Sequence, residues 1–135
     1  MLLSAATKID DPKAFVTEVY KQLMAKSSYE PPTDIYTPRL AKLFREDEKR
    51  AKGEVGCLEF NFWVNGQDFK ISRLAITSEE PGPDRKTVIA KFRNIDRREE
   101  IHFDFRRNAG RWMLDDVHSL LGDKWTLSQI LKCAP

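Results

Sequence analysis

Three aspartates and one histidine stand out as side chains suited to proton transfer. Asp47 lies seven residues after Leu40 and three after Phe44, which places it on the apolar side of a predicted helix. A carboxylate in that position loses contact with water, which disfavours its charged form and poises it as a base. The structural alternative is a buried Asp47 that accepts hydrogen bonds from backbone amides or an arginine and holds the helix to the sheet.

Asp68 follows Gln67 in the segment "NGQDFKISRL". The preceding pair, Asn65-Gly66, is a strong turn dipeptide, and an aspartate just beyond such a turn commonly braces the loop. The alternative is that Gln67 and Asp68 line a pocket in which Asp68 acts as a base. Both interpretations remain open on the sequence.

Asp116 and His118 lie in a predicted strand near the end of the chain. Side chains alternate along a strand, so Asp115 and Asp116 are expected on opposite faces. We take Trp112 and Leu114 as inward, which makes Asp116 and His118 inward too, whereas the opposite count would direct Asp115 inward. An aspartate and a histidine on one face form a plausible acid–base pair, because imidazole titrates near neutrality. The alternative is a surface histidine beside an aspartate.

Tyr36 and Trp112 complete the candidate pocket. Tyr36 directly precedes a predicted helix cap, so its hydroxyl is either a donor at the pocket mouth or part of a hydrophobic staple. His102, Asp104 and Arg106 alternate with apolar residues and are interpreted as a solvated or dimer-facing sheet surface.

The elements that position these residues follow from local signals. Asp11-Pro12 and Thr37-Pro38 are typical helix starts, Gly53 ends the second helix, and Thr126 caps a short last helix. Between them, alternating patterns predict an antiparallel meander with a loop at residues 81–84 and tight turns at "NIDRRE" and "NAGR". The clearest strand ranges are 69–77, 86–92, 101–106 and 112–118.

The predicted class is α+β, with N-terminal helices on a strongly curved antiparallel sheet of about four to five strands, a cone with a pocket, and a short C-terminal helix. With "YTPRLAKLFREDE", "NGQDFKISRLAIT" and "GRWMLDDVHS", the chain resembles the nuclear transport factor 2-like superfamily, and within it an uncharacterised bacterial family of small, often exported proteins. The resemblance spans roughly residues 11–130.

The resemblance implies a pocket between the sheet and the helices. Some members of the superfamily are isomerases, dehydratases or cyclases that use a pocket Asp, often with a Tyr or His, and their base lies in the general region of Asp68. Others only bind a ligand or pair through the open sheet, so a homodimer is expected. The narrower family usually carries an acid upstream of the Gln67-Asp68 pair, where this chain has Asn61.

Composition narrows the classes of partner. The 135 residues suffice for one domain, expected at 10–135, with residues 1–9 a disordered terminus or the remnant of a signal peptide. No apolar run is long enough for a membrane span, and the net charge of +2 is too balanced to argue for nucleic acid on its own. Six arginines form a candidate anion patch, although interleaved acids favour cross-strand pairing. They are Arg93, Arg97, Arg98, Arg106, Arg107 and Arg111.

The two cysteines leave two states open. Cys57 and Cys133 are compatible with one disulfide or with two free thiols, and their spacing from His102 and His118 does not match a four-ligand zinc site. We predict no metal and no cofactor. Export to the periplasm or outside the cell is the favoured location, with the cytoplasm as the alternative.

The sequence therefore predicts a binding or protein-interaction module, envelope-associated or immunity-like, that holds a small ligand or another protein. The alternative is a cofactor-independent isomerase or lyase in which Asp47 or Asp68 is the general base and Tyr36 or His118 stabilises the oxyanion.

Overall fold

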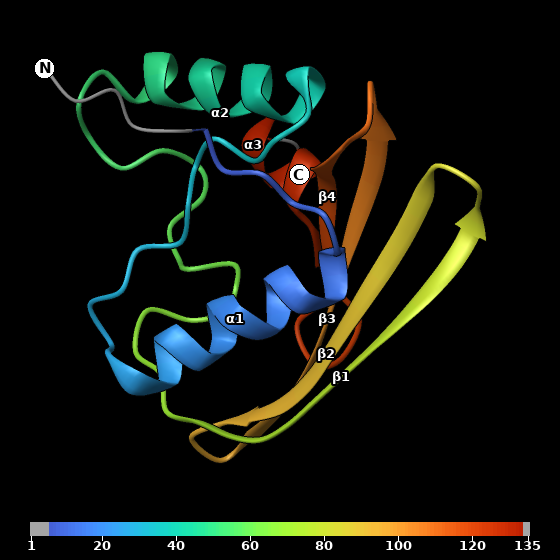
Figure 1. Ribbon diagram of the computed structural model, residues 1–135. Coiled ribbons are helices and arrows are strands. Elements are labelled where there is room, and N and C mark those ends of the chain that lie inside the picture. The colour runs from blue at the N-terminus through green and yellow to red at the C-terminus, as the bar shows by residue number, and fades with distance from the viewer. Residues whose placement is uncertain (1–5, 134–135) are drawn as a thin grey trace, which may run out of the picture.

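The chain folds into three helices and an antiparallel sheet of five strands, as a computed structural model shows for residues 6–133 (Figure 1). This is the predicted α+β class, with two N-terminal helices and a short C-terminal helix. The elements are α1 Pro12–Ala25, α2 Pro38–Ala51, β1 Ile71–Gly82, β2 Arg85–Asn94, β3 Arg97–Asn108, β4 Arg111–Ser119, β5 Trp125–Thr126 and α3 Leu127–Leu131. No helix in residues 6–133 is long and apolar enough to cross a bilayer.

Both long helices begin at the residues that the sequence predicts. The Asp11 carboxylate accepts hydrogen bonds from the backbone N–H groups of Lys13 and Ala14, at 3.0 and 3.3 Å, and a proline occupies the first turn. Thr37 plays the same part for α2. These caps satisfy amides that lack a partner within the helix, which is why such short local signals are reliable.

The sheet follows the strand order β1-β2-β3-β4-β5, so each strand pairs with its neighbours in the sequence. The turn between β1 and β2 comprises only Pro83 and Asp84, because β1 continues through Pro81 to Gly82 rather than ending before it. β1 is an edge strand, where the missing N–H of a proline costs no ladder bond. The predicted "NAGR" turn is confirmed, with Ala109 and Gly110 both at positive φ.

α1 lies across one face of the sheet, while α2 and α3 pack together against β4 (Figure 1). We call the face under α1 the inner face and the opposite one the outer face. Ile101, Phe103 and Phe105 point to the inner face and are buried, whereas His102 and Asp104 between them are only half-buried. The alternation predicted for this strand is therefore confirmed.

Aromatic rings fill the space between α1 and the inner face. Trp63 stacks on Phe103 with ring centroids 4.6 Å apart, and fully buried Tyr20 lies against both. The Tyr20 hydroxyl donates to the Trp63 carbonyl at 2.5 Å, which ties α1 to the segment before β1. The region in which a pocket was expected is therefore packed core at this point.

The sheet is open and curls only weakly, so the strong curvature expected from the sequence is not observed (Figure 1). The domain also begins before Asp10. Ile9 is 3% exposed within the core, and the Thr7 amide donates to Asp34 at 2.8 Å. Residues 1–5, which include most of the proposed signal-peptide remnant, lie outside the described residues.

Candidate functional site

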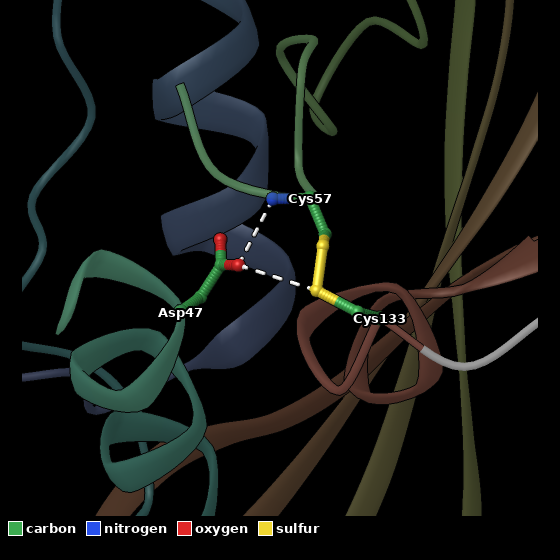
Figure 2. Close-up of side chains that lie close together, drawn as sticks. All are labelled: Asp47, Cys57 and Cys133. Atoms are coloured by element: carbon green, nitrogen blue, oxygen red, sulfur yellow. Dashed lines mark hydrogen bonds between the residues drawn. A yellow bond between two sulfur atoms is a disulfide. The ribbon is translucent and has the colours of Figure 1, made fainter. Parts of the chain in front are cut away.

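Asp47 points from α2 toward a disulfide between Cys57 and Cys133 (Figure 2). Its Oδ1 accepts the backbone N–H of Cys57 at 2.9 Å, lies 3.5 Å from the Arg50 guanidinium and lies 3.9 Å from the Cys133 sulfur. Asp47 is only 7% exposed, so its predicted burial is confirmed. Its partners are those of the structural alternative, a backbone amide and an arginine that fix the carboxylate.

Gly56 allows this close approach. A Cβ at that position would lie 2.3 Å from Oδ2 of Asp47, a separation that non-bonded atoms do not tolerate. The loop before Cys57 is therefore pressed against the carboxylate, and the disulfide joins this loop to the residue that follows the C-cap of α3.

Asp68 and Gln67 are exposed, and the segment before them is a tight turn. Asn61 and Gly66 exchange backbone hydrogen bonds at 3.1 and 3.4 Å, and Asn65 has a positive φ of 56°. Gln67 donates its side-chain amide to the Glu59 carbonyl at 3.0 Å. The turn interpretation of the segment fits this geometry, with Gln67 rather than Asp68 as its brace.

Tyr36 stacks on Phe44 of α2 with ring centroids 4.5 Å apart. Burial raises the pKa of its phenol to about 12, so the hydroxyl stays protonated at neutral pH. Tyr36 and Phe44 line an open cavity of about 380 Å³, together with Arg45 and Glu48. This cavity lies against α2, away from the disulfide-facing carboxylate of Asp47 on that helix.

Strand β4 contains a bulge that changes the expected facing of its side chains. Asp104 of β3 pairs with Asp116, and Phe105 pairs with Leu114, so Asp115 is an extra residue. The expectation that Asp115 and Asp116 face opposite ways is wrong: both carboxylates reach the guanidinium of Arg39, at 3.4 and 3.5 Å. A bulge sets two residues against one and interrupts the alternation.

Because of the same bulge, His118 does not point inward as the sequence predicted. After the extra residue, Val117 and Ser119 are the buried side chains, and His118 lies on the outer face opposite His102. Trp112 and Leu114 are inward, as predicted, but the count does not continue through His118. Asp116 and His118 still share a face, but in the described part of the chain, residues 6–133, their hydrogen bonds go to other residues.

Asp116 instead binds the last helix. Its Oδ1 accepts the Ser128 backbone N–H at 3.0 Å, and its Oδ2 accepts the Ser128 hydroxyl at 2.6 Å. Thr126 occupies the N-cap position predicted for it but makes no capping hydrogen bond through its side chain. A carboxylate from β4 thus supplies the cap that the local residue does not.

His118 belongs to a series of hydrogen-bonded side chains that crosses four strands of the outer face. Its Nε2 lies 2.7 Å from Oδ2 of Asp104, and its Nδ1 lies 3.1 Å from the Thr126 hydroxyl. The Thr87 hydroxyl donates to Oδ1 of Asp104 at 3.0 Å. An acid, an imidazole and a hydroxyl in series can hold or relay a proton. The spacing in the sequence had indicated Asp116, rather than Asp104, as the partner of His118.

The contact between His118 and Asp104 shifts the pKa values of the two groups in opposite directions. The hydrogen bond that His118 donates to Asp104 raises the pKa of His118 against the effect of burial, with the charges of Asp104 and Asp116 adding to it. Burial alone would raise the pKa of Asp104, but the hydrogen bond and charge of His118 lower it overall, helped by Thr87. The protonated imidazole and the ionised carboxylate therefore stabilise each other.

Trp112 is buried at one end of the inner face. Lys86 and Arg107 place their cations 5.1 and 5.0 Å from its ring centroid. These contacts are cation–π pairs within the chain, so Trp112 is a structural anchor in this arrangement.

A cationic cavity lies at the end of the sheet where β2 turns into β3. The cavity measures about 350 Å³ and includes Arg73, Lys91, Arg93, Arg98, Glu100 and Leu121 in its lining. Arg93 and Arg98 are directly opposite each other across the two strands, and Arg73 joins them from β1 with a positive φ of 53° at an irregularity of that strand. Within residues 6–133, these three arginines form no ion pair.

The predicted arginine patch therefore divides into two groups. Arg106 and Arg107 pair with Asp115 and Asp84, at 3.1 and 3.0 Å, as the interleaved acids suggested. Arg93 and Arg98 do not pair in this way and instead line the cationic cavity. Arg73 was missed, because nothing in its sequence context shows that a distorted edge strand turns it toward the other two.

The candidate residues named from the sequence do not form one centre. Asp47 faces the disulfide, Asp68 is exposed beyond a turn, Asp116 caps α3, and His118 lies on the outer face. No family model, no curated protein and no solved structure matches this chain. The assignment of a function therefore depends on the geometry of the chain itself.

Proposed function

We propose that this chain is a binding module that holds a small anionic ligand, through a carboxylate or phosphate group, in the cationic cavity. The observation that carries the proposal is the convergence of Arg73, Arg93 and Arg98 on one cavity, with no ion pair from any of them to another residue of the 6–133 range. Guanidinium groups bind carboxylates and phosphates through paired N–H donors, so three of them around one cavity favour such a group.

The facing pair Arg93 and Arg98 supports this proposal energetically. Like charges directly opposite each other on neighbouring strands destabilise a sheet, typically by a few tenths of a kcal/mol. A bound anion between them would remove this repulsion. Relief of this repulsion would add to the affinity of the cavity for an anion.

The two acids in the lining are already engaged elsewhere. Glu99 is buried and accepts the Asn65 side-chain amide at 3.0 Å, and Glu100 lies 2.7 Å from His102 Nε2. Neither neutralises the three arginines. Lys91 lies 3.8 Å from Glu100, which leaves the arginines as the positive charges that are open to a ligand.

The size of the cavity favours a small molecule over nucleic acid. About 350 Å³ lies at the lower end of the range for small-ligand pockets. Nucleic-acid binding proteins present a cationic stripe or face, whereas here Arg106 and Arg107 of the same sheet are paired with acids. We therefore expect one compact acidic molecule per chain.

The test is calorimetric titration of the protein with inorganic phosphate and with citrate at constant ionic strength. We expect saturable binding to the wild type, at least about tenfold weaker in Arg93→Gln/Arg98→Gln. Arg106→Gln/Arg107→Gln is the matched control, because it removes two paired arginines from the same sheet and should leave the affinity unchanged. Equal weakening in both variants, or no saturable binding to the wild type, would contradict the proposal.

The superfamily and the cellular location of the chain are also part of this proposal. The order of two helices followed by an antiparallel meander supports membership of the nuclear transport factor 2-like superfamily, and the Cys57–Cys133 disulfide supports export, because disulfides persist in oxidising compartments. The expected homodimer stays a prediction, which sedimentation velocity would test.

A proton-transfer enzyme is the second candidate, and one observation favours it. Asp104, His118 and Thr126 form a connected acid–imidazole–hydroxyl series that is partly open to solvent, unlike Asp47. The test is exchange of α-protons with solvent deuterium in a panel of 2-oxo and 3-oxo acids, followed by NMR. Exchange that His118→Gln abolishes would support this candidate, and exchange equal to that of buffer would eliminate it.

A further inference from the structure

Asp47, Cys57 and Cys133 bring three metal-binding side chains to one point. An oxygen of Asp47 and the two sulfurs all lie within 4.8 Å of one another. We propose that reduction of the Cys57–Cys133 disulfide converts this point into a binding site for one divalent zinc-type ion. The ligands would be the two thiolates, the Asp47 carboxylate and a water molecule. This proposal is independent of the anion site.

The three side chains come from separate parts of the fold (Figure 2). Asp47 lies on α2, Cys57 lies in the loop that follows it, and Cys133 comes just after the C-cap of α3. The Cα atoms of the cysteines are 5.5 Å apart. Because both cysteines are exposed and lie outside regular elements, their sulfurs can separate to the spacing of two zinc ligands, each about 2.3 Å from the metal.

The carboxylate is already directed at the sulfurs. It is buried, and the Cys57 N–H bond at 2.9 Å holds Oδ1 on the side of the disulfide. Oδ2 lies against Gly56, whose lack of a side chain leaves room for the carboxylate. A ligand that is fixed before the metal arrives loses little conformational entropy on binding.

The charges around the site suit a divalent cation. Two thiolates and one carboxylate carry three negative charges, and a divalent ion leaves one. Arg50, 3.5 Å from Oδ1 of Asp47, supplies the remaining positive charge. The Arg50 guanidinium also donates to the Leu131 carbonyl, so it can stay beside the site without occupying the coordination position.

A dithiol reductant supplies two electrons and two protons, the bond between the two sulfurs breaks, Cys57 and Cys133 become thiols, and the reductant becomes a disulfide. Binding of the metal then releases the two thiol protons to solvent. Thiolates favour zinc-type ions over magnesium or calcium, which prefer oxygen ligands.

Such a site would act at the stage before the disulfide exists. A newly made chain carries two thiols, so α3 and the loop after α2 are then joined only by non-covalent contacts. A bound ion would connect the same two segments that the disulfide later connects. Oxidation and metal binding therefore compete for the same pair of sulfurs.

The experiment uses Co²⁺ as a spectroscopic probe. The full chain is reduced with dithiothreitol, desalted under argon and titrated with Co²⁺. We expect one Co²⁺ per chain, with thiolate-to-cobalt charge-transfer absorption that Zn²⁺ abolishes, and no such absorption in the oxidised protein. Reduced protein that retains its circular dichroism but gives no charge-transfer band would overturn the proposal.

Two variants separate the proposed site from adventitious binding to thiols. Asp47→Asn should weaken Co²⁺ binding about tenfold or more, because it replaces a charged ligand. Asp68→Asn removes an exposed carboxylate beyond the turn and should bind like the wild type. Equal affinity in Asp47→Asn and the wild type would show that the carboxylate is not a ligand. If reduction unfolds the chain, Zn²⁺ must restore its circular dichroism, and failure to do so also overturns the proposal.

Discussion

Asp116 in β4 caps α3 by accepting both the backbone N–H and the hydroxyl of Ser128, at 3.0 and 2.6 Å. The two residues are separated by twelve positions, and the loop between them contains β5. The last helix is thus fixed by a buried carboxylate of the sheet rather than by the residue directly before it. The following predictions test this contact and three others.

Replacement of Asp116 by alanine should destabilise the protein by about 2 kcal/mol, because the cap of α3 is lost and a buried N–H is left without a partner. Urea unfolding followed by circular dichroism measures the change. Ser128→Ala is the control, since it removes the hydroxyl but keeps the N–H, and it should cost less than Asp116→Ala. Similar costs for both variants would mean that the backbone bond contributes little.

Gly56→Ala should destabilise the protein by about 1–3 kcal/mol, because the new methyl group overlaps the Asp47 carboxylate. Gly82→Ala is the control, since the nearest atom to its added methyl group is 3.9 Å away. The double variant Gly56→Ala/Asp47→Ala should cost less than the sum of its single changes, because the overlap has been removed. Additive costs would contradict a direct contact.

The His118–Asp104 pair should make the stability depend on pH at both ends of a window. The pKa of His118 is raised, so its contribution is complete below the usual value of 6.5 and is lost as the pH rises through the folded-state pKa. The pKa of Asp104 is lowered, so its contribution is complete above 3.8 and is lost as the pH falls through the folded-state pKa. The pair therefore contributes most between these two values.

Urea unfolding of the wild type and His118→Gln across this range measures the effect. The difference in free energy of unfolding should be no more than about 1 kcal/mol inside the window, as for partly exposed pairs, and smaller at more acidic and more alkaline pH. NMR titration should place the pKa of His118 above 6.5 in the wild type and lower in Asp104→Asn. An unchanged titration in Asp104→Asn would show that the carboxylate does not act on the imidazole.

Removal of the disulfide should cost on the order of 4 kcal/mol, since it closes a loop with a sequence separation of 76 residues. The variant Cys57→Ser/Cys133→Ser, unfolded in urea without metal, measures this cost. Wild type in reductant under metal-free conditions should lose a similar amount of stability. A loss below about 1 kcal/mol would indicate that the fold itself already restricts the loop.

Local signals explain which parts of the fold were predictable. Asp11 and Thr37 cap helices through contacts within three residues, so their roles are visible in the sequence. The burial of Asp47 was also visible, because helical spacing alone places it beside Leu40. Its partner Cys57, ten residues away, required the path of the loop after α2, which no periodic pattern specifies.

The parts that were not predictable depend on the register between strands. Continued from the Ala109-Gly110 turn, regular pairing would place Asp104 opposite Asp115, but the bulge places it opposite Asp116. The inward placement of His118 predicted from the sequence was incorrect for this reason, and the partnership of His118 with Asp104 was missed. The cationic cavity likewise requires the pairing of Arg93 with Arg98 and the distortion of β1.

The bulge at Asp115 shifts the alternation of side chains along β4 by one residue. The bulge absorbs Asp115, so Val117 lies opposite Phe103 and His118 opposite His102, whereas regular pairing that included Asp115 would drive His118 toward the core and expel Val117 from it. Deletion of Asp115 would leave these faces unchanged, because Leu114 and Asp116 would then be consecutive residues opposite Phe105 and Asp104.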